Sequence, residues 1–389
     1  MIFEKPGTSL KILVIAGEAS GDRLAARALF RLKEVAASRG KSAELFGIGG
    51  RECKDLGMNC LYTTDQMSVV GFLEVAKRYP FFRRVLKNIV SLLDSKRPDV
   101  IFLVDYPGFN LRVAKEAHKR GIRVVFYVSP QVWAWKASRI KDIVASVDDM
   151  LVIFPFEVDI YQHAGLTNTC FVGHPLLEII EQERSSYSTR EEFAAKFELD
   201  ATKEWLLAFP GSRTEEVARH LEVMNTAAKD FCLKKNWQAI IVQSASVPTE
   251  HYGGSDDPIV KTFRSPEDIH QLMHHAQLGI LKSGTTTLEA ALMALPGVIC
   301  YKTSGLTYMI AKRMITLKFI GLANIVLGKK LYPELIQSEF TSERITERLQ
   351  FVYDHRKTFT EDLKEVWNIL RAPNESPSKR VAEILTGNA

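Results

Sequence analysis

The sequence contains no long apolar run. No stretch reaches the about 18 consecutive apolar residues that a membrane-spanning helix needs. The first apolar run, 10–16, follows Glu4 and Lys5 and ends at a glycine turn, which indicates a first β-strand rather than a signal peptide. Any contact with a membrane is therefore expected to be peripheral.

Cysteine is scarce, and metal-binding patterns are weak. An odd number of cysteines without a C-x-x-C pair is typical of the reduced, buried thiols of a cytosolic protein. The acidic pairs Asp148-Asp149 and Asp256-Asp257 lack the D-x-D spacing of a metal motif, and we expect no metal. The five cysteines among the 389 residues are Cys53, Cys60, Cys170, Cys232 and Cys300.

The chain has only a small excess of basic residues. Lys and Arg number 51 against 46 Asp and Glu, which gives a net charge of +5. This bias suits an anionic substrate or an anionic membrane surface. It is too small to indicate nucleic-acid binding, and no zinc-finger or RNA-binding signature accompanies it.

Short apolar runs alternate with amphipathic stretches along most of the chain. Near-continuous apolar strands separated by helices indicate a parallel sheet that is covered on both faces. The charged segment 181–204 contains no strand pattern, and the alternation restarts after it. We therefore predict two Rossmann-like, doubly wound α/β domains with a linker near 175–200. The predicted strands are 10–16, 43–48, 99–104, 123–128, 150–154, 205–209, 239–243, 278–282 and 297–302.

The predicted domains cover 1–180 and 200–345. The remaining segment, 346–389, is polar and helical, and we expect it to pack on these domains or on a partner subunit. In open α/β sheets a ligand binds outside the C-terminal ends of the strands. A nucleotide-sized ligand is accordingly expected in a crevice between the two sheets.

The strand 205–209 runs into PGSRTEEV. Ser212 and Glu215 have the spacing of a capping box, which places Arg213 in the first turn of a helix. A cation is unfavourable there unless an anion compensates it, so the pattern favours a diphosphate site. The alternative is a solvated arginine paired with Glu216.

The strand 278–282 runs into SGTTTLEA. Ser283, Gly284 and Thr285 could bring backbone N–H groups and hydroxyls close to a phosphate. Glu289 lies one turn further on and could accept hydrogen bonds from ribose hydroxyls. An equally good interpretation on spacing alone is a capping box formed by Thr286 and Glu289.

Two N-terminal strands also end in polar turns. Asp105 follows 99–104 and could act as a general base, although Asx-turn chemistry is the simpler interpretation from the residues alone. The first strand runs into EASGD, which is not a dinucleotide-binding G-x-G-x-x-G but would place Glu18, Ser20 and Asp22 at the crevice. Trp133 and Trp135, near a third strand end, could stack on a sugar but are more often packing residues.

Residues 67–90 mix apolar and basic side chains, with Glu74 as the only acid. This composition suits the boundary between acyl chains and anionic head groups. An ordinary pair of amphipathic helices with a wet basic face explains it slightly better. The membrane-facing candidates are Val69, Val70, Phe72, Arg78, Phe81, Phe82, Arg83 and Arg84.

Several of these strings together resemble the lipid-A-disaccharide synthase family. They occur in order over nearly the whole chain, which makes the resemblance specific. The strings are AGEASGD (16–22), GFLEV (71–75), PDVIFLVDYPGFN (98–110), YVSPQVWAWK (127–136), FPFE (154–157), VGHP (172–175), PGSRTEEV (210–217), SGTTTLEA (283–290) and LANIVLG (322–328).

The resemblance implies the GT-B architecture, with an acceptor- and lipid-side N-terminal domain and a UDP-sugar-binding C-terminal domain. It implies transfer of 2,3-diacylglucosamine from UDP to the 6-hydroxyl of 2,3-diacylglucosamine 1-phosphate, with inversion, to give a β-1,6-linked disaccharide and UDP. No metal or other cofactor is expected. The enzyme would act as a peripheral protein on the cytoplasmic face of the inner membrane of a Gram-negative-type bacterium, and it could form a homodimer.

The same resemblance implies roles for individual residues. Asp105 becomes the expected base, with Glu18, Ser20 and Asp22 on the acceptor side. Some relatives carry a second acid where Gly108 stands, which weakly strengthens Asp105. The alternatives are another UDP-sugar GT-B enzyme such as a UDP-sugar epimerase, or a non-catalytic UDP-sugar or lipid-binding protein. The residues expected on the UDP side are Ser212, Arg213, Ser283, Gly284, Thr285, Glu289 and Asn324.

Overall fold

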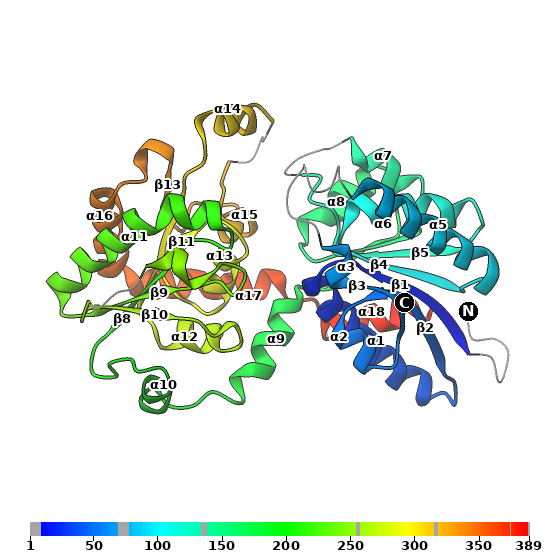
Figure 1. Cartoon of the computed structure of the whole chain (residues 1–389), viewed down its shortest axis with the longest axis horizontal. Coiled ribbons are helices and arrows are strands. Elements are labelled where there is room, and N and C mark those ends of the chain that lie inside the picture. The colour runs from blue at the N-terminus through cyan, green and yellow to red at the C-terminus, as the bar shows by residue number, and fades with distance from the viewer. Residues whose placement is uncertain are drawn as a thin grey trace. The chain divides into compact units, whose positions relative to one another are not determined.

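The computed structural model describes residues 9–68, 78–133, 138–253, 257–314, 318–373 and 375–387. The chain forms two compact units, each built around its own parallel sheet (Figure 1). Unit 1 comprises Met1–Glu178 and Leu370–Ala389, and unit 2 comprises Ile179–Ile369. The prediction of two doubly wound α/β domains is confirmed.

The sheet of unit 1 has seven strands in the order β3-β2-β1-β4-β5-β6-β7, and all of its pairings are parallel. The strands are β1 (Leu10–Ala16), β2 (Ala43–Gly49), β3 (Asn59–Thr63), β4 (Val100–Val104), β5 (Arg123–Tyr127), β6 (Asp149–Val152) and β7 (Thr169–Phe171). The helices are α1 (Ala19–Ala37), α2 (Arg51–Asp55), α3 (Thr64–Met67), α5 (Tyr79–Lys96), α6 (Pro107–His118), α7 (Arg139–Val144), α8 (Phe156–His163) and α18 (Pro377–Leu385).

Alternate residues of β1 enter two different cores. Ile12 and Val14 pack in the core that includes α1 and α18, whereas Leu13 and Ile15 pack in the core that includes α5 and α6. Figure 1 shows these helix pairs on opposite faces of the sheet. Because both faces are covered, the strand is apolar throughout, which is why it was visible in the sequence.

The sheet of unit 2 has six strands in the order β10-β9-β8-β11-β12-β13, also parallel. Helices α11 and α16 pack together against this sheet. The strands are β8 (Trp205–Phe209), β9 (Gln238–Val242), β10 (Val260–Phe263), β11 (Leu278–Lys282), β12 (Gly297–Tyr301) and β13 (Glu334–Ile336). The helices are α9 (Pro175–Arg184), which begins in unit 1, α10 (Arg190–Lys196), α11 (Thr214–Lys235), α12 (Ile269–His275), α13 (Thr286–Leu292), α14 (Gly305–Met314), α15 (Leu322–Leu327), α16 (Ser342–Asp354) and α17 (Arg356–Leu370), with 3-10 turns at Thr249–Tyr252, Pro266–Asp268 and Gln337–Glu339.

The chain passes between the units twice, and the first passage falls within the predicted linker near 175–200. The first passage lies inside α9, between Glu178 and Ile179. The charged segment that follows contains α10, which begins with a capping box between Thr189 and Glu192. The predicted C-terminal segment 346–389 is divided, because α16 and nearly all of α17 belong to unit 2 while α18 packs on α1 in unit 1.

The five cysteines are free thiols. Cys53, Cys232 and Cys300 are buried, and burial raises the pKa of Cys232 to about 12. Cys60 and Cys170 are only half-buried.

Candidate active site

Asp105 directly follows β4, at the C-terminal edge of the sheet of unit 1. Both Asp105 and Tyr106 have left-handed backbone conformations, with φ of 48° and 49°. Val128, which follows the neighbouring strand β5, has φ of 63°. A left-handed conformation is strained for Tyr and especially for Val, and such strain concentrates at functional sites.

The turn after β4 is held by two neighbours that sequence reasoning did not assign. The buried side chain of Asn110 donates from Nδ2 to the carbonyl of Asp105 at 2.7 Å and to that of Ile15 at 3.4 Å. The Tyr106 ring lies against Gly17, where a Cβ atom would be 2.5 Å from the ring. The glycine in AGEASGD therefore makes room for the turn that presents Asp105.

The surroundings of Asp105 favour its neutral form. Burial, followed by the nearby carboxylate of Glu18, raises the pKa of Asp105 to about 6, although the backbone N–H of Tyr106 opposes this shift. An Asx turn would use the N–H two residues further on, which here belongs to Pro107 and does not exist. The turn-forming interpretation of Asp105 is therefore wrong.

The other acceptor-side candidates separate into exposed and buried groups. Glu18 and Ser20 are exposed at the start of α1. Asp22 is only 4% exposed, and its carboxylate accepts hydrogen bonds from the backbone N–H groups of Gly50 at 2.6 Å and Glu52 at 3.0 Å. We therefore assign Asp22 to holding the start of α2 rather than to proton transfer.

Glu157, the last residue of the FPFE string, is a buried carboxylate whose role the sequence does not indicate. It accepts hydrogen bonds from Ser129 Oγ at 2.7 Å and from Trp133 Nε1 at 2.9 Å. Burial raises the pKa of Glu157 to about 7 despite these donors. Trp133 is thus anchored as part of the fold, and His174 is buried nearby against Phe154, where burial lowers its pKa to about 3. Trp135 lies outside the described residues.

In unit 2, the turns that contain Arg213 and Ser283 follow the neighbouring strands β8 and β11. The helix after β8 begins at Thr214, with Arg213 as its N-cap residue. The predicted capping box of Ser212 and Glu215 is wrong, because Glu216 instead accepts the hydrogen bond from the Ser212 backbone N–H at 3.1 Å. Gly211 is required beside it, since a Cβ atom there would lie 2.6 Å from Glu216 Cβ.

Lys282 links the two turns and was missed in the sequence. Its Nζ donates to Glu216 Oε1 at 2.7 Å, and both side chains are largely buried. The alternative of Arg213 paired with Glu216 therefore does not hold, because Lys282 occupies that carboxylate. Within the described chain the exposed Arg213 side chain has no hydrogen-bond or ion-pair partner.

The SGT turn has the donors that a phosphate needs. Ser283 Oγ donates to the Ile320 carbonyl at 2.8 Å, so its hydroxyl is already used. In the part of the chain that the structure describes, the backbone N–H groups of Gly284, Thr285 and Thr286 donate no hydrogen bond. Successive N–H groups of this kind form a concave anion-binding surface.

Glu289 does not form the capping box that was its alternative role. Helix α13 has Thr285 as its N-cap residue, and no side-chain hydrogen bond caps it. The Glu289 carboxylate instead lies 3.8 Å from His270 Nε2. The capping-box alternative is therefore excluded, and the interpretation of Glu289 as a carboxylate that faces the ligand remains.

Asn324 is fully buried and saturated with hydrogen bonds. Its Nδ2 donates to the Tyr332 carbonyl and to Glu334 Oε1, each at 2.9 Å. Its Oδ1 accepts from the backbone of Leu331 and Tyr332. We therefore do not assign Asn324 to the nucleotide. It holds Glu334, whose carboxylate in turn accepts a hydrogen bond from the Ile320 backbone N–H at 3.1 Å.

The predicted membrane segment is only partly described. Val69, Val70 and Phe72 lie outside the described residues. Phe81 and Phe82 are half-buried against the core of unit 1, and the Arg78 guanidinium lies 4.9 Å from the Phe81 ring centroid. Of the described membrane-facing candidates only Arg83 and Arg84, both in α5, are exposed. Among the described residues no helix is long and apolar enough to cross a membrane.

Helix α12 contains two histidines with the H-x-x-x-H spacing. His270 and His274 stand four residues apart, a spacing that metal-binding pairs use. His270 Nδ1 is bonded to Glu183, however, and the His274 ring packs on Tyr187. No group of three or more metal-binding side chains was found in the described ranges.

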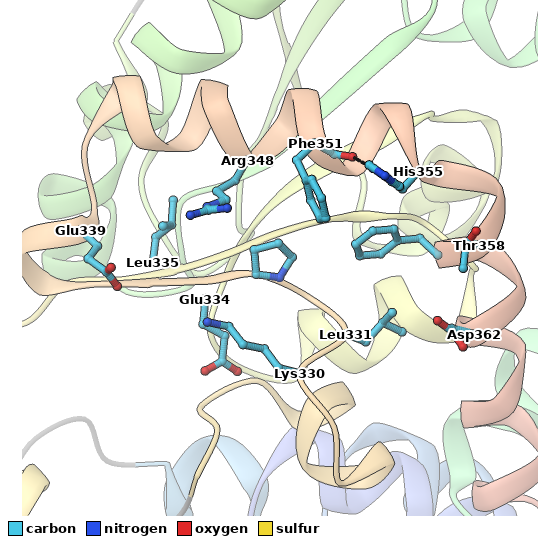
Figure 2. A pocket seen from close by; sticks show the side chains of 12 residues that line it. Lys330, Leu331, Glu334, Leu335, Glu339, Arg348, Phe351, His355, Thr358 and Asp362 are labelled. Carbon is cyan, nitrogen blue, oxygen red and sulfur yellow. Dashed lines mark hydrogen bonds between the residues drawn. The ribbon is translucent and has the colours of Figure 1, made fainter.

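A cavity of about 490 Å³ lies elsewhere in unit 2. Figure 2 shows Arg348 and Phe351 of α16 on one side of it and Lys330 and Leu331 on the other, and Asp362 of α17 also lines it. None of the residues predicted to bind the nucleotide lines this cavity.

Comparison with known proteins decides the family. The family model described as "Lipid-A-disaccharide synthetase" matches residues 12–380. This chain belongs to the lipid-A-disaccharide synthase family. The lipid-A-disaccharide synthase of Trichlorobacter lovleyi is 39% identical over 345 residues, which are 87% of each chain. That of Acidobacterium capsulatum is 35% identical over 96% of this chain and 95% of its own.

Solved structures show how this family member relates to other folds. A UDP-GlcNAc 2-epimerase from Neisseria meningitidis matches with a TM-score of 0.65 and 12% identity, covering 97% of this chain and all of that one. A calicheamicin glycosyltransferase matches with a TM-score of 0.60 and 14% identity, covering 97% of each chain. At such low identities the likeness establishes the GT-B fold alone.

The family assignment confirms the prediction of an enzyme, a glycosyltransferase of lipid A biosynthesis. It does not test the individual site residues. Their assignment rests on the geometry: Asp105 and Glu18 lie together in unit 1, and Arg213, Lys282 and the SGT turn lie together in unit 2.

Proposed function

We propose that this member of the lipid-A-disaccharide synthase family joins UDP-2,3-diacylglucosamine to 2,3-diacylglucosamine 1-phosphate. The products are UDP and a β-1,6-linked disaccharide 1-phosphate. The observation that carries the proposal is the carboxylate of Asp105, which lies at a strained strand end with a pKa raised to about 6 by burial and Glu18. A catalytic base works best with a pKa near the working pH.

The proposed reaction is a direct displacement at the anomeric carbon of the donor sugar. Asp105 accepts the proton of the acceptor 6-hydroxyl. At the same time the hydroxyl oxygen of the acceptor attacks C1 of the donor sugar from the face opposite the diphosphate. The new C1–O6 bond forms as the bond from C1 to the phosphate oxygen breaks, and UDP leaves with the electron pair. Attack from the opposite face inverts the configuration and gives the β linkage.

Unit 2 supplies the groups that stabilise the departing UDP. The Arg213 side chain has no hydrogen-bond or ion-pair partner within the described chain, and the backbone N–H groups of Gly284, Thr285 and Thr286 donate no hydrogen bond there. Preorganised donors of this kind act on charge that develops in the transition state, each worth about 3 kcal/mol. Glu289 is proposed to receive the ribose hydroxyls, while Ser212 and Ser283 shape the two turns.

We propose that this charge stabilisation makes a metal unnecessary. Arg213, whose side chain has no ion-pair partner in the described chain, provides positive charge that a divalent cation supplies in other sugar-nucleotide enzymes. Turnover should be unchanged after treatment with a chelator. Loss of activity that added Mg²⁺ restores would contradict this part of the proposal.

We also propose that the enzyme works at an anionic membrane surface, on its cytoplasmic face. Both substrates carry acyl chains, and Arg83 and Arg84 provide exposed positive charge on α5 of unit 1. A homodimer is compatible with this proposal, and sedimentation in detergent would determine the oligomeric state.

The test of the proposed function is release of UDP with and without the acceptor. We expect UDP to appear only when UDP-diacylglucosamine and acylated glucosamine 1-phosphate are both present. UDP-sugar conversion without an acceptor would indicate an epimerase. Tight nucleotide binding with no UDP release under any condition would indicate a binding protein.

A further inference from the structure

His270 lies between two carboxylates in unit 2. From α12, its Nδ1 lies 2.6 Å from Glu183 Oε2 on α9, and its Nε2 lies 3.8 Å from Glu289 Oε1 on α13. The side chain is only 8% exposed. A histidine outside the motifs of the nucleotide site therefore touches the carboxylate that we propose for the ribose.

The Nε2 atom of His270 is buried and has no hydrogen-bond partner. Buried polar atoms without partners are rare in folded proteins, so each one calls for an explanation. The distance of 3.8 Å to Glu289 is too long for a hydrogen bond but short enough to become one after a small side-chain movement.

The charges around the ring favour its doubly protonated form. Burial alone would lower the pKa of His270, but the carboxylates of Glu289 and Glu183 raise it above its ordinary value. His274 and His275 share α12 with His270, and burial lowers the pKa of each, which favours their neutral forms. As an imidazolium, His270 has N–H donors on both sides of the ring.

We infer that His270 is a positioning residue for nucleotide binding: anchored by Glu183, it holds the Glu289 carboxylate in the orientation that receives the two ribose hydroxyls. The inference rests on the proposed ribose role of Glu289. One carboxylate oxygen faces His270 Nε2, which leaves the rest of the carboxylate to accept from the diol. A purely structural role, tying α9 to α12, would need only the bond to Glu183.

The test compares binding of UDP and of 2′,3′-dideoxy-UDP, which lacks the diol, to the full-length protein by calorimetry. His270→Asn keeps an amide near the Nδ1 position and removes the group facing Glu289. His270→Gln does the reverse, placing an amide near Nε2. Glu289→Gln tests the ribose role by itself.

We expect the wild type to prefer UDP over the dideoxy nucleotide by roughly tenfold or more, the worth of hydrogen bonds to a charged group. This preference should fall towards one in Glu289→Gln and in His270→Asn, and should be partly kept in His270→Gln. Equal weakening of both nucleotides in His270→Asn, or no change, would overturn the inference.

Failure of the inference can be told apart from failure of the ribose role. If Glu289→Gln keeps the wild-type preference, or if the wild type has none, the ribose role is wrong and the inference falls with it. If only His270→Asn keeps the preference, the inference alone is wrong. If His270→Asn does not fold, Glu183→Gln and His270→Gln replace it. A reduced preference for UDP over the dideoxy nucleotide in these variants supports the inference. A preference equal to that of the wild type overturns it.

Discussion

Backbone strain at the C-terminal edge of the sheet of unit 1 coincides with the residue that we assign as the base. Asp105, Tyr106 and Val128 all have positive φ, and the first two are consecutive. Each such residue costs about 1–3 kcal/mol and persists only where its neighbours enforce it. Here Asn110 and the close contact of Tyr106 with Gly17 provide that enforcement. These contacts hold the turn in its strained conformation, in which the Asp105 carboxylate is close enough to Glu18 for the two charges to interact.

Replacing Asp105 with Asn should lower turnover by about 10²–10⁴ while UDP affinity and melting temperature stay close to wild type. Asn tolerates the left-handed conformation but cannot accept the proton. Initial rates, calorimetry with UDP and thermal unfolding test this. Asp142→Asn, at an exposed partner of Lys115, is the control with the same charge change. Wild-type turnover in Asp105→Asn would exclude it as the base, and Glu18 would be tested next.

The pH dependence of kcat/KM follows from the raised pKa of Asp105, which burial and Glu18 set to about 6. The base must be ionised, so kcat/KM should rise with pH, be half-maximal near pH 6 and fall about tenfold for each pH unit below that. Glu18→Gln removes the neighbouring negative charge and should move this midpoint to lower pH. A midpoint near pH 4 in the wild type would contradict the assignment.

Replacing Arg213 with Ala should weaken UDP binding by roughly ten- to a hundredfold, because a charge-assisted hydrogen bond to the diphosphate is lost. Uridine, which has no phosphate, should bind both proteins equally. The matched control is Arg219→Ala on the same helix, where the arginine pairs with Glu215 at 3.4 Å. Unchanged UDP affinity in Arg213→Ala would leave this residue as a surface arginine.

At the scale of elements, the strands that escaped prediction are the edge strands of the two sheets. These are β3 and β7 in unit 1 and β10 and β13 in unit 2. An inner strand of a covered parallel sheet is buried on both faces and appears as a continuous apolar run. The edge strands Asn59–Thr63 and Val260–Phe263 are partly exposed and contain polar residues, so neither appears as a continuous apolar run.

Those parts of the candidate site that directly follow an inner strand could be predicted from the sequence. The positions of Asp105, Arg213 and the SGT turn at strand ends follow from the order of strands and helices. The hydrogen bonds that decide individual roles do not, because they join residues far apart in the sequence. Glu216 with Lys282 and Asp22 with the start of α2 are such cases.

We predict that helix α5 binds an anionic membrane surface through Arg83 and Arg84. Arg83→Glu with Arg84→Glu should release the protein from vesicles that contain anionic lipid at moderate salt, because each basic contact near the surface is worth about 1 kcal/mol. Co-sedimentation with vesicles tests this. Lys234→Glu with Lys261→Glu is the control, since both lysines are exposed in unit 2. Equal binding by the α5 variant and the wild type would move the membrane contact elsewhere.

At the scale of the whole molecule, the two units carry different parts of the proposed chemistry. Unit 1 holds the carboxylate that accepts the proton, and unit 2 holds the cations and N–H groups for the diphosphate. The chain enters unit 2 within α9 and returns to unit 1 at Leu370, where α18 completes the core around α1. Removing α18 should therefore destabilise unit 1.

The central claim is that one new glycosidic bond joins the two acylated sugars. Its most direct test is the structure of the product made by the wild-type protein from UDP-2,3-diacylglucosamine and 2,3-diacylglucosamine 1-phosphate, determined by mass spectrometry and NMR. We predict a single disaccharide 1-phosphate with a β configuration at the new anomeric carbon and a linkage to the 6-oxygen, formed in equal amount to UDP. An α linkage, a bond to another hydroxyl, or a UDP-sugar changed only within its own ring would contradict the account.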